Sequence, residues 1–384
     1  MNKSTDSELR VKPIDEVVIK VASLCNLNCS YCYMYNLTPG SLEFWRRQPR
    51  FVSNEVVSKI AVSAREYFEK REVINPRLVF HGGEPLLAGT ARFEEWFQIL
   101  GDVFRGSKIE LRIGVQTNGI LFNQEWGELF RRWGIHLGIS VDGAPGLHDD
   151  KRVDHKQRPA GIAIERGIKL LSEEYPDVFS GLLAVIDLTH EPVAVIDYLL
   201  RWDPPSIDLL LPLDTQDRLP TAKKLNIEDV SYGKWLVSVG NRLVELKSKV
   251  PVRCLNNLFE RLASKENNGL LFGDSWDVVS VRPDGGIEIL DTFLASDPSL
   301  RSLNLNISES SFFDIETALN RFAGKAAQLL AIPAECEKCP FLSVCGGSVL
   351  SSRYSMDKQF QNRSFYCSDM KHLINWGRSL CASE

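Results

Sequence analysis

Up to about residue 214, the chain alternates short apolar segments with longer segments whose apolar residues recur at helical spacing. The predicted strands are Val17–Val21, Leu78–His81, Leu111–Gln116, Ile135–Val141, Leu182–Ile186 and Ile207–Leu211. The predicted helices span about 54–70, 91–105, 123–132, 160–174 and 192–201. Parallel strands need a crossover, usually a helix. The alternation therefore predicts an α/β fold, a partial barrel of six βα units with ligands at the carboxyl ends of its strands.

The remainder of the chain has shorter predicted elements. A helical stretch is expected over about 227–265, and VVSVRPDGGIEIL predicts a hairpin that turns at Asp284-Gly285-Gly286. A last helix is expected near 367–380. We therefore predict four parts: a polar tail at 1–14, the α/β core at 15–214, a helical connection at 215–270 and a C-terminal domain at 271–384.

The overall charge and composition exclude several classes of protein. Hydrophobic residues make up 44% of the 384 residues, which is typical of a folded globular chain. Lys plus Arg number 45 and Asp plus Glu number 50, a net charge of −5, so we expect no nucleic-acid partner. No apolar run is long enough for a membrane span, and the polar start does not resemble a signal peptide. We expect a cytoplasmic protein without a membrane partner.

The cysteines are grouped rather than dispersed. Of nine, seven fall into two tight groups, which is typical of metal ligands and not of loop-closing disulfides. The groups are Cys25, Cys29 and Cys32, and Cys336, Cys339, Cys345 and Cys367. Cys254 is expected to be a buried free thiol, with a leftover ligand as the alternative, and Cys381 an inert thiol near the end.

The first group has the spacing Cys25-x3-Cys29-x2-Cys32, directly after the first predicted strand. Three thiolates on one loop can hold three corners of a cubane iron–sulfur cluster, which leaves the fourth iron open to a chelating molecule. A zinc knuckle would need a fourth ligand nearby, and no His or Cys follows within about forty residues.

This spacing, with the aromatic Tyr31 before the last Cys, resembles the signature of the radical S-adenosylmethionine (SAM) enzymes. The resemblance implies a [4Fe–4S] cluster whose open iron binds SAM. It also implies that an external electron donor reduces the cluster, that a carbon–sulfur bond of SAM then breaks, and that a 5′-deoxyadenosyl radical forms.

Three further motifs and one arginine follow the predicted strands in the order found in that family. They are His81-Gly82-Gly83-Glu84-Pro85, Gln116-Thr117-Asn118-Gly119, Ser140-Val141-Asp142-Gly143 and Arg152. Taken alone, a segment such as GGEP or TNG is also typical of a turn. The resemblance implies that this set binds SAM, with Arg152 pairing with its carboxylate. The SAM-binding residues expected are Gly82, Gly83, Glu84, Thr117, Asn118, Ser140, Asp142 and Arg152.

The second group has the spacing Cys336-x2-Cys339-x5-Cys345-x21-Cys367. Four thiolates fit either a structural zinc or a fully ligated iron–sulfur cluster, and spacing does not choose between them. The group resembles the SPASM extension of peptide-modifying radical SAM enzymes, which implies an auxiliary [4Fe–4S] cluster within 271–384. The two-cluster form of that extension has cysteines where this chain has Val349 and Leu290, so one auxiliary cluster is expected.

Within that family, the chain most resembles the cyclophane-forming peptide maturases, through HGGEPLLAG, DGGIEILDTF and CGGSVLSSRYS. This implies a carbon–carbon crosslink between an aromatic ring and the β-carbon of another residue in a ribosomally made precursor peptide. Alternatives within enzymes are a sulfatase-maturing oxidase of Ser or Cys and a thioether-forming maturase. The alternative outside enzymes is an iron–sulfur redox regulator, which would have no need of a SAM pocket.

Two further segments have competing interpretations. Asp291 aligns with a carboxylate that related enzymes use to remove a proton, which makes it the candidate catalytic base, and it can equally cap the segment that follows it. The segment FWRRQPRF at 44–51 is expected to be a solvated surface loop, with contact to a substrate peptide as the alternative.

Overall fold

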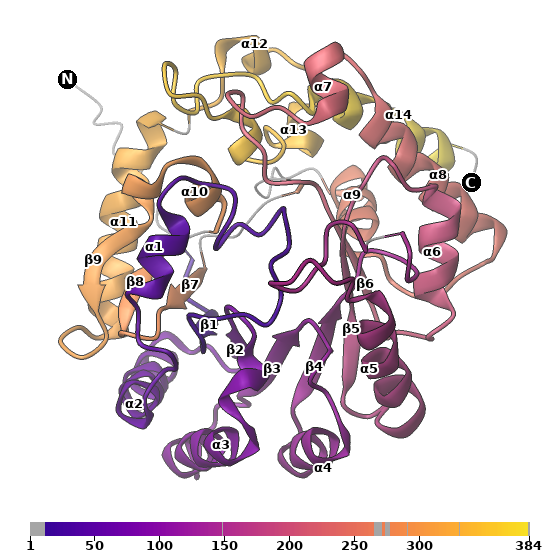
Figure 1. Ribbon diagram of the computed structural model, residues 1–384. Coiled ribbons are helices and arrows are strands. Elements are labelled where there is room, and N and C mark those ends of the chain that lie inside the picture. The colour runs from indigo at the N-terminus through magenta and orange to yellow at the C-terminus, as the bar shows by residue number, and fades with distance from the viewer. Residues whose placement is uncertain are drawn as a thin grey trace, which may run out of the picture.

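The computed structural model describes residues 12–147, 149–264, 271–272, 277–289, 291–329 and 331–382. Nine strands of this part form one open sheet in the order β6-β5-β4-β3-β2-β1-β7-β8-β9. Strands β1 to β6 are parallel, and Figure 1 shows them as an arc with helices α2 to α6 on its outer side. The α/β class and the partial barrel are thereby confirmed.

The six parallel strands and the five helices between them follow the predicted pattern within a few residues. The strands are β1 (Glu16–Lys20), β2 (Arg77–His81), β3 (Arg112–Thr117), β4 (His136–Ser140), β5 (Phe179–Val185) and β6 (Ile207–Leu210). The helices are α2 (Asn54–Arg71), α3 (Thr90–Phe104), α4 (Gln124–Trp133), α5 (Gly161–Glu174) and α6 (Pro192–Leu200). Local chemistry explains their boundaries. Ser53 caps α2 by accepting a hydrogen bond from Val56 N at 3.2 Å, and Gly134 ends α4 in the left-handed conformation.

The predicted hairpin forms and joins the same sheet. Strands β7 (Val278–Val281) and β8 (Gly286–Glu288) are antiparallel, and β9 (Ser302–Asn306) pairs with β8. Strand β7 runs parallel to β1, with Val17 opposite Val279. The sheet therefore continues from the six-unit core into the C-terminal part, an arrangement that the order of elements along the chain did not indicate.

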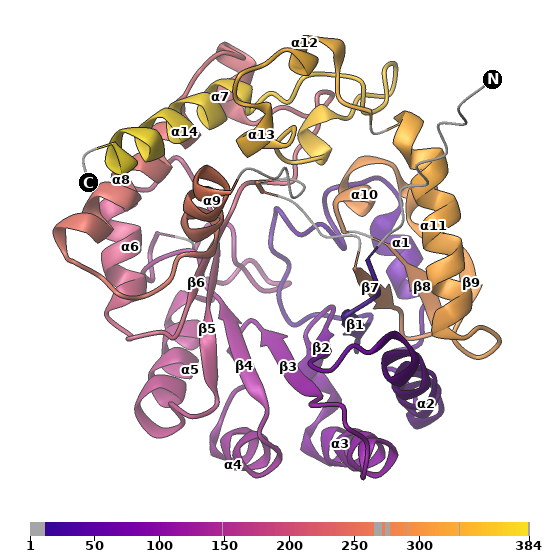
Figure 2. The same ribbon diagram turned by 180° about the vertical axis from the view of Figure 1, so that it is seen from behind.

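The remaining elements surround one side of the arc. They are α1 (Ser41–Arg46), α7 (Thr221–Leu225), α8 (Ser231–Glu245), α9 (Arg253–Ala263), α10 (Asp291–Ser296), α11 (Phe312–Leu329), α12 (Ala334–Glu337), α13 (Leu342–Cys345) and α14 (Cys367–Cys381), with short 3₁₀ turns at Pro85–Ala88, Pro298–Leu300 and Ser351–Arg353. Figure 2 shows α9 beside β6, and α14 packs along α8. None of the described helices is both long and apolar enough to cross a membrane.

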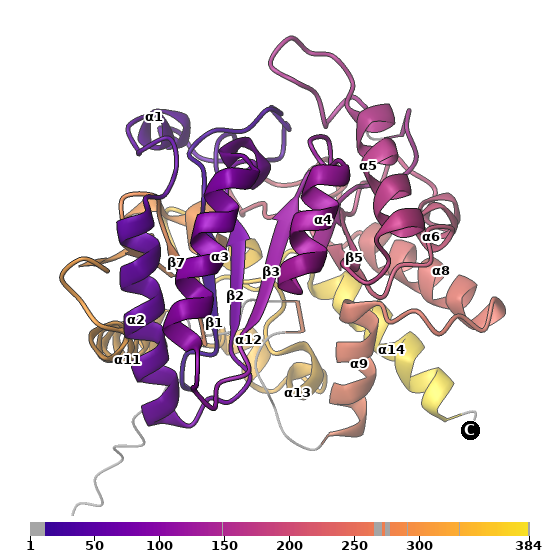
Figure 3. The ribbon, with the colours of Figure 1, turned by 90° about the horizontal axis from the view of Figure 1, so that it is seen from below.

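Two sequence expectations were wrong in detail. The helical stretch predicted over 227–265 is two helices, because the chain leaves α8 before Pro251 and starts α9 after it. The segment 44–51 is not a solvated loop throughout, because it begins inside α1, where Trp45 is 1% exposed. Figure 3 shows α1 and the loop before it beyond the ends of the strands, where the predicted ligands would lie.

Candidate active site

The loop that carries the first three cysteines follows β1 and folds against the segment at 151–155. Asn28 N donates to Val153 O at 2.7 Å, and Ser30 N donates to Lys151 O at 3.1 Å. From the same segment, His155 Nε2 lies 2.9 Å from the carbonyl oxygen of Cys25. These contacts hold the loop in a fixed shape over the ends of the strands.

The three thiols of this loop lie close enough to influence one another. Burial raises the pKa of Cys32 to about 11, and the neighbouring Cys29 adds to the shift. Burial likewise raises the pKa of Cys25 well above its ordinary value, with Glu84 as the next cause. A thiol of this kind stays protonated until a cation replaces its proton. The sulfur atoms therefore fit a positively charged iron centre.

The thiols are not arranged around a single ion. Among the described residues, no three His, Cys, Asp or Glu side chains meet at one metal position. In a cubane each thiolate binds a different iron, so the sulfur atoms of its ligands lie further apart than those around one ion. Cys25, Cys29 and Cys32 can hold three corners of such a cluster.

The glycines of the second motif allow two parts of the chain to approach each other closely. Gly83 has φ +57°, and a Cβ added there would lie 2.1 Å from the carbonyl oxygen of Leu24. At Gly82, with φ +80°, it would lie 2.7 Å from the Cβ of Lys20. The neighbour of both glycines is thus the end of β1 and the start of the cysteine loop. The close approach and the positive φ angles both require glycine at these two positions.

Glu84 connects this motif to the next. It is fully buried, and its Oε1 accepts hydrogen bonds from Leu86 N at 2.9 Å and Thr117 Oγ1 at 2.6 Å. Its Oε2 accepts from Asn118 N at 2.9 Å. Burial raises the pKa of Glu84, while the donors of Asn118 and Thr117 oppose that rise. Glu84 and Thr117 thus bind each other, which makes Glu84 a residue that positions β3 against the loop.

The third and fourth motifs also bind parts of this chain. Ser140 Oγ accepts a hydrogen bond from Gln116 Nε2 at 2.9 Å. Asp142 is buried and accepts hydrogen bonds from Arg152 Nε at 2.8 Å, from Val185 N at 2.9 Å and from the hydroxyl of Tyr31. Burial favours the protonated form of Asp142, but the charge and hydrogen bonds of Arg152 outweigh it and lower the pKa.

One nitrogen of the Arg152 guanidinium stays available for a ligand. Its Nε and Nη2 bind the two oxygens of Asp142, whereas Nη1 makes no hydrogen bond to any described residue. The guanidinium lies over the Tyr31 ring, 5.6 Å from the centroid, and its charge lowers the pKa of Cys29 against the larger effect of burial. An anionic group beside the cysteine loop can therefore bind Arg152, which fits a carboxylate of SAM.

Sequence reasoning missed a buried ion pair at the same end of the sheet. Lys20, the last residue of β1, lies 2.7 Å from Glu288, the last residue of β8, and both side chains are 0% exposed. The Lys20 ammonium also lies near the Tyr33 and Trp45 rings, 5.8 and 5.4 Å from their centroids. A lysine within the otherwise apolar predicted strand Val17–Val21 was the signal that could have identified this pair.

The candidate base Asp291 follows Glu288 by three positions and is the first residue of α10. Its side chain lies outside the described part of the structure. Both sequence interpretations of Asp291 therefore stay predictions.

The second cysteine group also gathers in space. Burial raises the pKa of Cys345 to about 11, and the thiols of Cys367, Cys336 and Cys339 add to the shift. Arg353 lies against this group at 2% exposure and donates to Phe360 O at 2.8 Å and Ala331 O at 2.6 Å. Burial lowers the pKa of Arg353 to about 10, and Cys336 and Cys345 oppose that change. Four thiols and a buried cation fit an anionic metal centre.

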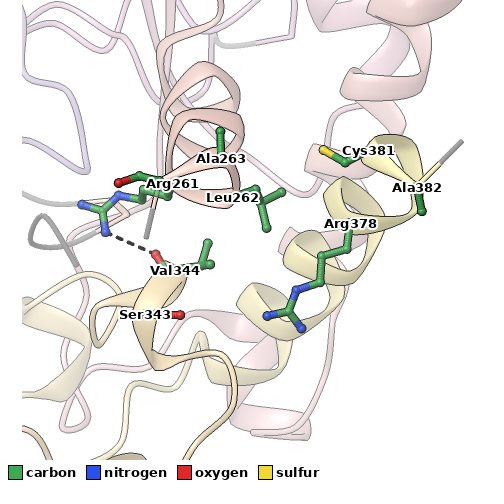
Figure 4. Close-up of a pocket in the computed structure, with 9 residues that line it drawn as sticks. Arg261, Leu262, Ala263, Ser343, Val344, Arg378, Cys381 and Ala382 are labelled. Atoms are coloured by element: carbon green, nitrogen blue, oxygen red, sulfur yellow. Dashed lines mark hydrogen bonds between the residues drawn. The ribbon is translucent and has the colours of Figure 1, made fainter. Parts of the chain in front are cut away.

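The two other cysteines lie apart from both groups. Cys254 is buried in α9, as predicted, and Cys381 is exposed at the end of α14. Cys381 lines a pocket of about 580 Å³ between α9, α13 and α14, drawn in Figure 4. There Arg261 Nη1 donates to Val344 O at 3.3 Å. The described lining contains none of the residues predicted to bind a cluster or SAM, so the pocket is separate from the candidate active site.

Comparisons with known proteins agree with this assembly. Residues 19–199 match the sequence model of the Radical SAM superfamily. The serine-type anaerobic sulfatase-maturating enzyme of Bacteroides thetaiotaomicron is 22% identical over 373 residues, which cover 92% of this chain and 86% of that enzyme.

Two solved structures share the fold. Native anSMEcpe with bound AdoMet and Cp18Cys peptide has a TM-score of 0.77 at 21% identity, covering 96% of this chain and 98% of that one. SuiB from Streptococcus suis, bound to precursor peptide SuiA, has a TM-score of 0.61 at 14% identity, covering 94% of this chain and 76% of that one.

Proposed function

We propose that this chain, which is a radical SAM enzyme, modifies a side chain of a peptide substrate. The observation that carries the proposal is the loop of three thiols, held over the strand ends by the GGEP, TNG and SVDG segments. A [4Fe–4S] cluster and SAM are its cofactors, and together they supply a 5′-deoxyadenosyl radical that takes a hydrogen atom from the substrate. The peptide class is supported by two solved structures that contain bound peptides and whose folds match 96% and 94% of this chain.

The residues that would hold these groups follow from their contacts. Cys25, Cys29 and Cys32 hold the first cluster, and Arg152 offers Nη1 to the carboxylate of SAM. The second cysteine group holds the auxiliary [4Fe–4S] cluster, with the buried Arg353 offsetting part of its negative charge.

The finer proposal is a crosslink between an aromatic ring and a β-carbon of the same peptide. It is supported by the motif DGGIEILDTF, in which Asp291 follows by three positions the last residue of the strand that the Lys20–Glu288 pair ties to β1. In this reaction a base must remove the ring proton and an acceptor must take one electron. Asp291 would be the base, and the auxiliary cluster the acceptor.

A second candidate reaction is oxidation of a Ser or Cys side chain. It is favoured by the similarity to sulfatase-maturating enzymes over nearly the full chain. The cysteines expected for a second auxiliary cluster are replaced by Val349 and Leu290, which favours the crosslink instead.

Each edge of the described sheet carries a local feature that opposes regular pairing with a peptide strand. At one edge, β6 is bridged by Val252 at Ile207. At the other, Asn304 of β9 has φ +56° and its N–H binds Ser302 Oγ at 3.0 Å. A bend of this kind interrupts the regular row of backbone groups with which another strand would pair.

The decisive experiment gives the reduced, fully loaded enzyme and SAM two kinds of peptide. One is an aromatic-rich peptide encoded beside the gene, and the other carries a single Ser or Cys. Both a crosslink and oxidation of Ser remove two hydrogens, but only oxidation leaves a carbonyl that a hydrazide captures. We expect the aromatic-rich peptide to lose two hydrogens without hydrazide capture. Capture would establish the oxidase instead, and 5′-deoxyadenosine formation that no peptide stimulates would contradict the peptide class itself.

A further inference from the structure

The side-chain amide of Asn118 lies between β3 and the first cysteine loop. Its Nδ2 donates to Asn26 Oδ1 at 2.7 Å and approaches Cys25 Sγ at 3.9 Å, within hydrogen-bonding range of a sulfur. Asn118 is 8% exposed. The sequence motif suggested a contact with SAM, whereas this geometry directs the amide at a cluster ligand.

The orientation of this amide is fixed at its other end. Asn118 Oδ1 accepts a hydrogen bond from Ile120 N at 3.1 Å, and its backbone N–H binds the buried Glu84. The Ile120 N–H is a donor, so the amide oxygen must face it and the NH₂ group must face the cysteine loop. Rotating the amide by half a turn would set the NH₂ group against the Ile120 N–H, and the carbonyl oxygen against Asn26 Oδ1.

Cys25 differs from Cys29 and Cys32 in the hydrogen bonds that its sulfur receives. Its sulfur receives Leu27 N at 3.3 Å as well as Asn118 Nδ2. Backbone N–H groups of Tyr35 and Met34 also face Cys32 Sγ, but among the described residues neither Cys29 Sγ nor Cys32 Sγ receives a side-chain hydrogen bond. Hydrogen bonds to the sulfur ligands of an iron–sulfur cluster stabilise its more reduced, more negative state and raise its reduction potential.

We propose that Asn118 is a positioning residue for the first cluster: its amide, oriented by Asn26 and Ile120, hydrogen-bonds the Cys25 sulfur and raises the reduction potential. This inference depends on the radical SAM chemistry of the chain and not on which peptide it modifies. A wrong substrate class would therefore leave it unaffected.

Two substitutions at Asn118 remove the donor in different ways. Asn118→Asp keeps the oxygen that accepts from Ile120 but replaces NH₂ by an anionic oxygen. Asn118→Leu is similar in size and uncharged. The matched control is Asn36→Ala, because Asn36 lies on the same loop and binds the backbone oxygen of Cys29 at 2.7 Å rather than a sulfur.

The test is an anaerobic redox titration of the fully loaded chain, followed by electron paramagnetic resonance. The first cluster is recognised because SAM addition alters its signal. We expect both Asn118 variants to lower the equilibrium constant for reduction by tenfold or more, about 59 mV for one electron, with Asp the larger effect. Asn36→Ala should leave the potential unchanged.

Several results would overturn the proposal. Unchanged potentials with weakened SAM binding would make Asn118 a SAM contact, as its motif first suggested. A shift in Asn118→Asp without one in Asn118→Leu would reflect added charge alone. An equal shift in Asn36→Ala would reflect general disturbance of the loop. Loss of the first cluster from both Asn118 variants, leaving about four of the eight irons in a folded chain, would assign the residue to cluster assembly.

Discussion

Arg152 Nε lies 2.8 Å from Asp142 Oδ2 in an ion pair whose side chains are 6% and 4% exposed. The pair joins the end of β4 to the segment that supports the cysteine loop, and Tyr31 of that loop donates its hydroxyl to the same carboxylate. Residues that the sequence indicated as separate SAM contacts therefore bind one another. Asp142 holds Arg152 beside Cys29, and Arg152 offers its remaining donor to a ligand.

Asp142→Asn should test this arrangement through stability. The change leaves a buried guanidinium without its counter-charge, and breaking a buried pair in this way costs about 3–5 kcal/mol. Thermal unfolding of the anaerobic enzyme should show a clearly lower midpoint, and SAM affinity should fall with it. As a control, Asp177→Asn removes an exposed partner of Arg131 and should leave both quantities nearly unchanged. Equal midpoints for the two variants would contradict a stabilising role of the buried pair.

The same pair predicts a pH dependence. The pKa of Asp142 is lower in the folded state than its ordinary value of about 3.9. Its stabilising contribution is therefore complete above that ordinary value and is lost as the pH falls through the lowered folded-state pKa. The difference in unfolding midpoint between the wild type and Asp142→Asn should be constant from neutral pH to about pH 5 and shrink below about pH 4. A difference that grows on acidification would mean that Asp142 is protonated in the folded enzyme.

Gly83→Ala should prevent the first cluster from forming correctly. The new Cβ would meet the Leu24 carbonyl oxygen at 2.1 Å, so the cysteine loop must move. Gly40→Ala is the matched control, because Gly40 also has a positive φ, +78°, but a Cβ there meets nothing within 4 Å. We expect Gly83→Ala to lose SAM cleavage and first-site iron, whereas Gly40→Ala should retain both with a modest fall in stability. Iron content and 5′-deoxyadenosine formation measure the two effects.

The local pattern was readable from the sequence because each βα unit is specified by neighbouring residues. The apolar runs around Val17 and Leu78 and the helical spacing over about 54–70 place β1, β2 and α2 almost at their observed ends. The pairing of β7 with β1 was not readable, because it joins segments more than two hundred residues apart. The burial of Trp45 was missed for a similar reason, since Lys20 and other parts of the fold surround it.

The candidate site was predictable as a location but not as a set of contacts. Parallel strands bring their carboxyl ends to one edge, so Glu84, Asn118 and Asp142 had to lie near the cysteine loop. Spacing along the chain does not say which polar groups bind one another. Glu84 proved to bind Thr117 and Asn118, and Asn26, which no motif reasoning selected, proved to bind Asn118.

Metal analysis tests both cysteine groups. Anaerobically reconstituted enzyme should hold about eight irons per chain, as two cubanes of four. Replacing Cys25, Cys29 and Cys32 by Ala should leave about half of that iron and abolish SAM cleavage. Replacing Cys254 by Ala should leave the iron content unchanged, because this buried thiol lies apart from both groups. Stoichiometric zinc in place of half the iron would show that the C-terminal group holds zinc instead.

Asp291→Asn separates radical generation from product formation. The substitution keeps the size and hydrogen-bonding capacity of the side chain and removes its basic site. If Asp291 removes the ring proton, it acts after hydrogen abstraction. The variant should then load both clusters and form 5′-deoxyadenosine when given peptide, while crosslinked product falls by about 10²-fold or more.

Isotope transfer makes this prediction specific. Deuterium at the abstracted position of the peptide should still appear in 5′-deoxyadenosine made by Asp291→Asn, because abstraction precedes the lost step. Product at the wild-type rate would leave Asp291 as a structural residue in the first turn of α10. Loss of SAM cleavage together with product would instead mean that Asp291 positions the peptide or supports the fold. Only formation of deuterated 5′-deoxyadenosine without crosslinked product identifies Asp291 as the base.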